Sequence, residues 1–305
     1  MSCARFQVAH ERVIESQKGR RAALIVNADD YGMSRGVSEG IRVAHREGIV
    51  TSASAIMTTE CATEELLAAR EEAPSLAFGV HLSMSCGRPV LPPGKVRSLV
   101  SSDGSFLAAH AVRNVNLEEL RQELRAQVEK FLETGVRLTH LNSHQCLLER
   151  DMAFFAEELD LADEFGVAVR WFPHIVFRHF SPPESQDGVR VLDAYEGLIK
   201  RKKLVHTDSV LYETRIAVDD IKRAVSSLSV GVHELMCHPG HVDRRLRECD
   251  TYIEAREHEL RVLTDMNLKE YLAYSDVALA DFTVLRVARS NPCRETGERT
   301  FCRHY

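Results

Sequence analysis

The chain has 305 residues, of which 44% are hydrophobic and 28% are charged, and its formal net charge is −6. This composition is typical of a globular protein, and the acidic balance gives no basis for binding nucleic acid or an anionic membrane. The length suits one large α/β domain or two small ones.

Targeting signals and cysteine spacing indicate the cellular compartment and whether the cysteines form disulfides or bind zinc. No stretch approaches the ~20 apolar residues of a membrane span, and the first twenty residues lack the apolar core of a secretory signal. We therefore expect a cytoplasmic protein in which residues 1–20 are flexible. The eight cysteines include no Cys-x-x-Cys pair, which indicates reduced thiols and not a disulfide framework or a thiolate zinc site.

Strand and helix patterns alternate along the chain. The apolar run Leu24–Val26 predicts a strand buried on both faces, and Ser34 predicts the N-cap of a helix that Gly48 ends. Residues 173–218 have too weak a pattern for any assignment. The other predicted strands are 51–57, 76–82, 136–144, 167–172, 231–238 and 275–279, and the predicted helices are 34–47, 64–72, 116–133, 151–165, 219–228 and 252–266.

This order predicts an α/β fold with parallel strands. About seven or eight strand-then-helix units favour a TIM-like (β/α) barrel, with a doubly wound sheet as the alternative. The barrel is preferred because polar candidates follow many strands and do not gather at one crevice. The chain has no Gly-x-Gly-x-x-Gly fingerprint after the first strand and no Gly-Lys-Ser/Thr loop, so nucleotide binding lacks its usual support.

We expect a single barrel domain over residues 21–288, followed by a loosely attached tail at 289–305. The segment from 83 to 116 interrupts the rhythm, because its many prolines and glycines are unfavourable in a core element. It follows a strand that ends in a histidine, so we interpret it as a lid over a site.

Two adjacent carboxylates, Asp29 and Asp30, stand at the end of the first strand. Such a pair is costly when buried, unless a metal binds one carboxylate and the other handles protons. The alternative is a solvated turn that only caps the next helix.

Other strand ends supply His81, His144, Arg170 and His238. In a barrel these ends converge on one face, and two imidazoles with one carboxylate suit zinc or another divalent ion. Each residue also has a structural alternative: a core histidine, an ion-pair partner or a turn cap. His140 is interpreted as a packing or supporting residue.

Four ordered motifs resemble those of YdjC-like carbohydrate deacetylases, and the resemblance runs from about residue 22 to about 280. The motifs are Asn27-Ala-Asp-Asp-Tyr-Gly32, Gly79-Val-His-Leu82, Thr139-His-Leu-Asn-Ser-His144 and Met236-Cys-His-Pro239. The resemblance implies a TIM-like barrel, one divalent metal ion (magnesium or zinc), and removal of an N-acetyl group from an amino sugar. By position, it implies that Asp30, His81 and His144 are metal ligands and that Asp29 is the catalytic base.

The chain departs from the family pattern at two places. Cys146 and Leu148 stand where family members often carry histidines, and Thr207-Asp208-Ser209 replaces a Thr-Asp-His stretch. The expected ligand set is intact, but the substitutions leave the substrate open.

We therefore expect a metal-dependent carbohydrate deacetylase acting on a small sugar. His238 is assigned as general acid, and Arg170 as a group that orients the substrate or assists the oxyanion. Residues assigned to substrate binding are Asn142, Asp208 and Glu234, of which Glu234 could instead lie deeper and hold the charged His238 ring. The alternatives are a metal-dependent hydrolase of another bond, such as a phosphoester, and a sugar-binding protein without turnover. A homodimer is the one oligomeric state that we consider for this chain.

Overall fold

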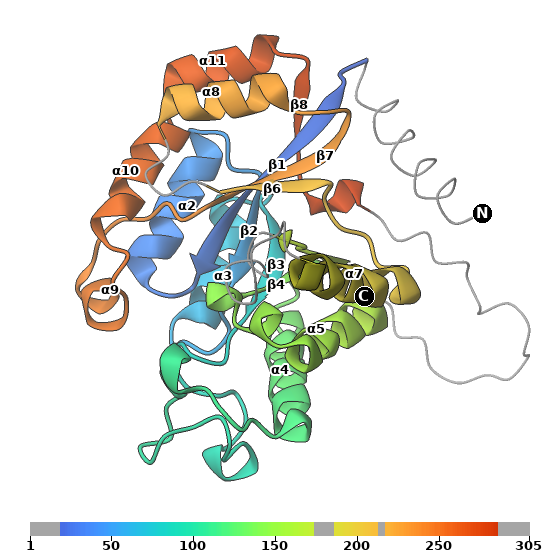
Figure 1. Ribbon diagram of the computed structural model, residues 1–305. Coiled ribbons are helices and arrows are strands. Elements are labelled where there is room, and N and C mark those ends of the chain that lie inside the picture. Colours follow the sequence, from blue (N-terminus) through green and yellow to red (C-terminus); the bar gives the residue numbers. More distant parts are fainter. Residues whose placement is uncertain (1–18, 174–185, 213–216, 286–305) are drawn as a thin grey trace, which may run out of the picture.

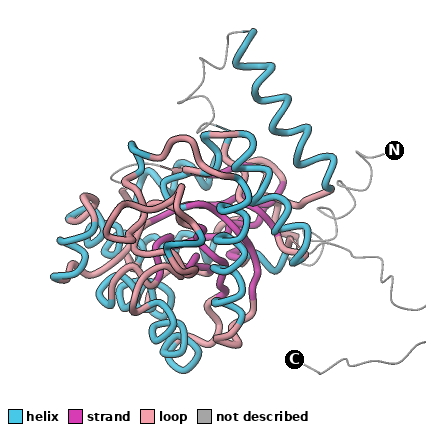
Figure 2. Tube along the Cα trace, turned by 90° about the horizontal axis from the view of Figure 1, so that it is seen from below, coloured by secondary structure: helices cyan, strands magenta, loops and turns pink. Residues whose placement is uncertain are grey.

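The computed structural model describes residues 19–173, 186–212 and 217–285. A sheet of parallel strands lies at its centre, with helices around it (Figures 1 and 2). The strands are β1 (Ala22–Tyr31), β2 (Ser52–Ala55), β3 (Ala77–Leu82), β4 (Leu138–Ser143), β5 (Ala168–Val169), β6 (Ser209–Leu211), β7 (Gly231–Cys237) and β8 (Val277–Ala280). The α-helices are α2 (Arg35–Arg46), α3 (Ala62–Glu72), α4 (Leu117–Leu132), α5 (Met152–Phe165), α7 (Gln186–Lys202), α8 (Val218–Ser227), α9 (Arg244–Cys249), α10 (Glu254–Leu263) and α11 (Met266–Tyr274).

The strand order is β5-β4-β3-β2-β1-β7-β6, and β8 pairs with the first half of β1. All the strand pairs are parallel. The sheet curls into a half-barrel, and no strand ladder joins β5 to β6 within the described ranges. The predicted α/β fold with a TIM-like parallel barrel is thus confirmed, in this partly open form.

Strand β1 is the centre of the sheet because it is buried along its whole length and pairs with three other strands. Its apolar residues fill the core, and its polar end turns sharply. Asp30 has φ 70° and Gly32 has φ 84°, a left-handed conformation that non-glycine residues adopt rarely. Ser34 then caps α2 as predicted, its Oγ accepting from Val37 N at 3.2 Å.

Two parts of the chain differ from their sequence-based assignment. The helix predicted at 252–266 is α10, which ends at Leu263, and a further helix that was not predicted, α11, follows it. Asp265 caps α11 by accepting from the backbone N–H groups of Asn267 and Leu268. Within 173–218, where no element was assigned, the structure has α7 and β6. Strand β6 is only three residues long, too short for a periodic signal.

The insertion at 83–116 is packed against the barrel. It contains the 3₁₀ helices η1 (Pro93–Lys95) and η2 (Ala109–Ala111) and an antiparallel bridge between Val100 and Phe106. The buried Glu123 of α4 accepts from the backbone N–H groups of Val90 and Leu91 at 2.9 and 3.0 Å. The segment is therefore anchored at its base, and its action as a lid stays a prediction.

The predicted flexible N-terminus (1–20) and tail (289–305) lie outside the described residues, except for positions 19 and 20. The five cysteines within the described ranges are free thiols. Among the described helices, none has the length and apolar character needed to cross a bilayer.

Candidate metal and catalytic site

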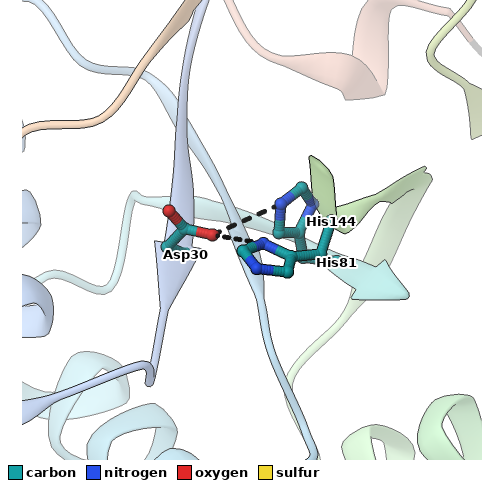
Figure 3. A group of neighbouring side chains, drawn as sticks. All are labelled: Asp30, His81 and His144. Carbon is teal, nitrogen blue, oxygen red and sulfur yellow. Dashed lines mark hydrogen bonds and ion pairs between the residues drawn. The ribbon is translucent and has the colours of Figure 1, made fainter. Parts of the chain in front are cut away.

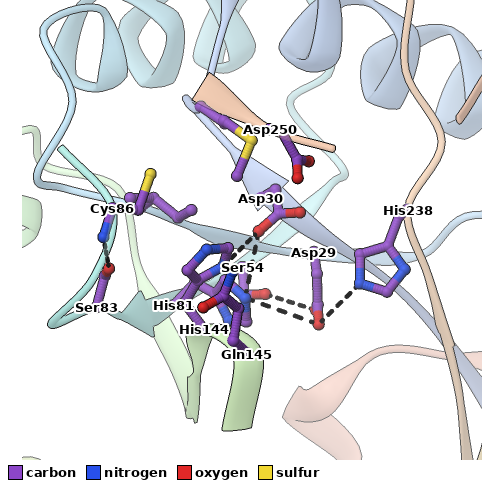
Figure 4. A network of polar contacts seen from close by, with 12 residues as sticks. Asp29, Asp30, Ser54, His81, Ser83, Cys86, His144, Gln145, His238 and Asp250 are labelled. Atoms are coloured by element: carbon purple, nitrogen blue, oxygen red, sulfur yellow. Dashed lines mark hydrogen bonds and ion pairs between the residues drawn. The ribbon is translucent and has the colours of Figure 1, made fainter. Parts of the chain in front are cut away.

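The carboxyl ends of four strands bring most of the expected residues together (Figure 4). The two aspartates end β1 and His81 lies near the end of β3. His144 begins the 3₁₀ helix η3 (His144–Cys146) after β4, and His238 directly follows β7. This convergence follows from the parallel sheet, in which all carboxyl ends lie at one edge.

Asp30, His81 and His144 form the one group of metal-ligating side chains found among the described residues (Figure 3). Their ligand atoms lie within 4.8 Å of one another, and all three residues are buried. Asp30 Oδ1 is 2.9 Å from His144 Nδ1 and 3.4 Å from His81 Nε2. Two imidazoles and one carboxylate are a donor set that suits a catalytic divalent ion with open positions.

Asn142 controls which nitrogen of His81 is available. His81 Nδ1 lies 2.7 Å from Asn142 Oδ1, and in this orientation Nδ1 carries the proton and Nε2 is free to bind a cation. With the amide turned over, its nitrogen would donate to Nδ1 and its oxygen would accept from Arg170 at 3.1 Å. The first orientation is the one compatible with a metal at Nε2, and in it Asn142 lies behind the His81 imidazole and holds it.

Asp29 is buried and saturated with donors. Arg170 donates from Nη1 to Oδ2 at 2.6 Å and from Nη2 to Oδ1 at 2.8 Å. Asn27 Nδ2 and Ser54 Oγ each donate to Oδ1 at 2.8 Å. Burial alone would raise the pKa of Asp29, but the Arg170 guanidinium and the nearby imidazoles hold that pKa well below its usual range. Asp29 therefore stays ionised.

His238 faces Asp29 from the side opposite His81 (Figure 4). Asp29 Oδ2 is 3.9 Å from His238 Nε2 and 3.9 Å from His81 Nε2. The His238 ring makes edge contacts with Tyr212 and Tyr252, and its backbone N–H donates to Glu259 Oε2 at 2.5 Å. His238 thus lies between an aromatic wall and the carboxylate.

The other two residues assigned to substrate binding lie elsewhere. Glu234 is fully buried behind Arg170, whose Nε and Nη2 donate to Glu234 Oε1 at 2.8 and 2.5 Å. Asp208 lies before β6, at the amino-terminal edge of the sheet, where its Oδ2 accepts from Val232 N at 2.8 Å. The structure does not bring Asp208 to the cluster, because β6 begins after it and the site lies at the other strand ends.

The family departures lie next to the site but outside the ligand group. Cys146 and Leu148 are both buried in the turns after His144. Gln145 and Cys146 have φ 55° and 49°, so this turn is built from two successive left-handed residues. His140 packs its ring on Phe282 with centroids 3.8 Å apart, which fits its interpretation as a packing residue.

Sequence reasoning missed three residues that contact the two aspartates: Asn27, Ser54 and Arg256. Asn27 carried a signal, because it is a polar residue directly after the apolar run Leu24–Val26. Ser54 stood out less, because β2 alternates serine with alanine. Arg256 carried no such signal, because it lies on α10 and not at a strand end. Its Nη2 donates to Asp30 Oδ2 at 2.6 Å. Its place depends on the path of the chain between β7 and α10, which no local pattern encodes.

Comparisons with known proteins show which family the chain belongs to. A profile of the YdjC-like protein family matches residues 23–274. A carbohydrate deacetylase from Brevibacillus brevis is 35% identical over 86% of this chain and 99% of the relative. One from Thermoanaerobacter pseudethanolicus is 28% identical, with the same coverage. A solved structure from Enterococcus faecalis, named as a cellobiose-phosphate cleavage protein, is 30% identical with a TM-score of 0.76, covering 88% of this chain and 100% of its own. The chain therefore belongs to the YdjC-like family.

Proposed function

We propose that the protein is a metal-dependent hydrolase that removes the N-acetyl group from a small amino sugar or chito-oligosaccharide. The relatives named carbohydrate deacetylase support the reaction class. The observation that carries the proposal is the position of Asp29, whose Oδ2 lies 3.9 Å from an imidazole of the candidate metal group and 3.9 Å from His238. The carboxylate of Asp29 thus lies between the candidate metal group and a second imidazole, that of His238.

Asp30, His81 and His144 are proposed to hold the ion. A bound divalent cation supplies Lewis-acid chemistry, polarising a carbonyl and making water more acidic. This chemistry matters here because Asp29, with its lowered pKa, is a weak base, and a weak base needs an acidic proton. The donor set with two imidazoles favours zinc or another transition ion over magnesium, which prefers oxygen ligands.

Two residues of the chain are proposed to move protons. Asp29 takes a proton from water as the oxygen of that water bonds to the acetyl carbon. His238 gives a proton to the nitrogen as the carbon–nitrogen bond breaks, because an amine anion is a very poor leaving group. The products are acetate and the free amine. Because each of the two side chains handles one proton, Asp29 need not return the proton that it takes from water.

Arg170 is proposed as a positioning residue and not as a substrate contact. It is 1% exposed, and its guanidinium donates to Asp29 and Glu234. Burial raises the pKa of the Glu234 carboxyl. Glu234 and Arg170 together fix the plane of the Asp29 carboxylate, so that Oδ2 keeps its place between the two imidazoles.

Acetate release from N-acetylglucosamine oligomers tests the proposal. We expect the wild type to release acetate and to leave p-nitrophenyl phosphate intact. Phosphate release without acetate release would assign the site to a phosphoester hydrolase. Sugar binding without either product would assign it to a binding protein.

A further inference from the structure

Arg256 of α10 is buried deep in the site although it comes from a helix outside the sheet. Its side chain is 1% exposed. Its Nη2 donates to Asp30 Oδ2 at 2.6 Å and to Asp250 Oδ2 at 2.6 Å, while its Nε donates to the Tyr252 carbonyl at 2.9 Å. These three hydrogen bonds, made by Nε and Nη2, hold the guanidinium in place, so it can hold a partner in one orientation.

The two oxygens of Asp30 have separate surroundings. Oδ2 accepts from Arg256, and Oδ1 faces the imidazoles of His144 and His81 at 2.9 and 3.4 Å. A carboxylate that is free to rotate could offer a cation either oxygen or both. Here Oδ2 is engaged, so Oδ1 alone is left for the group of ligand atoms.

We propose that Arg256 is the positioning residue of Asp30, which it orients so that Oδ1 alone serves the divalent ion. The inference rests on the proposed metal site and adds to it a residue that touches no ligand atom directly. It also gives the two aspartates parallel supports: Arg170 orients Asp29, and Arg256 orients Asp30.

Helix α10 contacts the backbone around His238 as well as the side chain of Asp30. The Arg256 carbonyl accepts from Gly240 N at 3.2 Å, in the turn just behind His238. One turn further along the helix, Glu259 accepts from His238 N at 2.5 Å. A shift of α10 would therefore move the metal ligand and the proposed acid together.

Zinc affinity of the purified full chain tests the proposal without reference to turnover. We would measure it by competition with a chromophoric chelator for the wild type, Arg256→Gln and Arg256→Lys. Loss of a residue that orients a metal ligand commonly costs about 10–100-fold in metal affinity. We expect a loss of that size for Arg256→Gln. The loss should be smaller for Arg256→Lys, which keeps the charge without the planar fork.

The matched control is Arg261→Gln, an exposed arginine on the same helix, for which the zinc affinity should equal that of the wild type. A purely structural Arg256 would lower the melting temperature of the metal-free protein and leave the zinc affinity of the folded protein unchanged. That result, or tighter zinc binding in Arg256→Gln, would overturn the inference. If Arg256→Gln fails to fold, Arg256→Lys decides by the same criterion. A wild type that binds no zinc would instead remove the proposed metal site itself.

Discussion

Arg170 holds Asp29 by both carboxylate oxygens, with Nη1 2.6 Å from Oδ2 and Nη2 2.8 Å from Oδ1. The guanidinium is in turn anchored on the buried Glu234. A bidentate pair of this kind fixes geometry as well as charge. Asp29 therefore cannot rotate, and its Oδ2 stays between His81 and His238.

Asp29→Asn is expected to keep the metal and lose most of the hydrolysis. The change is nearly isosteric and removes the proton acceptor, and loss of a general base commonly costs about 10²–10⁴-fold in rate. Elemental analysis and acetate release on the same sample would check it. Asp30→Asn is the matched comparison, because it should lose metal as well as activity. If Asp29→Asn lost its metal, Asp29 would have to be reassigned as a ligand.

His238→Gln is expected to lose activity on amides and to recover part of it on an activated ester. The ester's leaving group needs no proton, so a missing general acid matters less for that substrate. Rates on both substrates would be measured, with His241→Gln as the control because His241 is exposed three residues along the same turn. Equal losses on amide and ester would show that His238 does not act as the acid.

Glu158→Gln is expected to stabilise the fold at neutral and alkaline pH. Glu158 of α5 is buried, and neither of its carboxyl oxygens has a hydrogen-bond partner within the described residues. Burial, together with the nearby Glu149, raises the pKa of Glu158 well above 4.5. The unfolded chain loses this proton near pH 4.5 and the folded chain keeps it, so the wild type loses stability as pH rises above that value.

Urea unfolding at pH 4, 6 and 8 would measure the effect. Each unit of pKa shift is worth about 1.4 kcal/mol, so Glu158→Gln should exceed the wild type by at least about 1 kcal/mol at pH 8 and match it at pH 4. Glu164→Gln, at the exposed end of the same helix, should follow the wild-type slope within about 1 kcal/mol. If the unfolding free energy of Glu158→Gln and of the wild type depended on pH in the same way, the raised pKa of Glu158 would be contradicted.

The segment 83–116 is expected to close over bound substrate. It begins beside His81, and the exposed Arg97 and Arg113 within it are accessible to trypsin. Trypsin digestion of Asp29→Asn, with and without an N-acetylglucosamine oligomer, would test closure, because the slow variant holds its substrate. Cleavage at these two arginines should slow when substrate is present, while cleavage at Arg223 on the distant α8 should not change. Equal cleavage at Arg97 and Arg113 in both samples would argue against a lid.

The candidate ligand group could be anticipated from sequence because each member lies at or just past the carboxyl end of a buried strand. A parallel sheet places all such ends at one edge, so strand assignment alone brings Asp30, His81 and His144 together. The same logic could not be applied to Asp208, because β6 is so short that its direction and start could not be assigned. Asp208 precedes this strand and therefore lies at the opposite edge.

Residues that enter the site from helices had no comparable signal. Arg256 lies 226 positions from Asp30 along the chain, and its approach depends on how α9 and α10 pack on the barrel. Glu234 was placed on the correct strand, but whether it met substrate or Arg170 depended on the side-chain packing of three strands. Sequence periodicity shows which face of a helix or strand a residue lies on, but it does not show which residue that side chain meets across the core.

Acetate release as a function of bound zinc tests the central claim most directly. The purified chain would be freed of metal with a chelator and titrated with zinc. Acetate release from N-acetylglucosamine oligomers and zinc content would be measured at each step, for the wild type and for His81→Ala. The account predicts that acetate release rises in proportion to bound zinc, reaches its plateau at one ion per chain, and is absent in His81→Ala. Full acetate release from the metal-free protein, or a plateau of bound zinc without acetate, would contradict it.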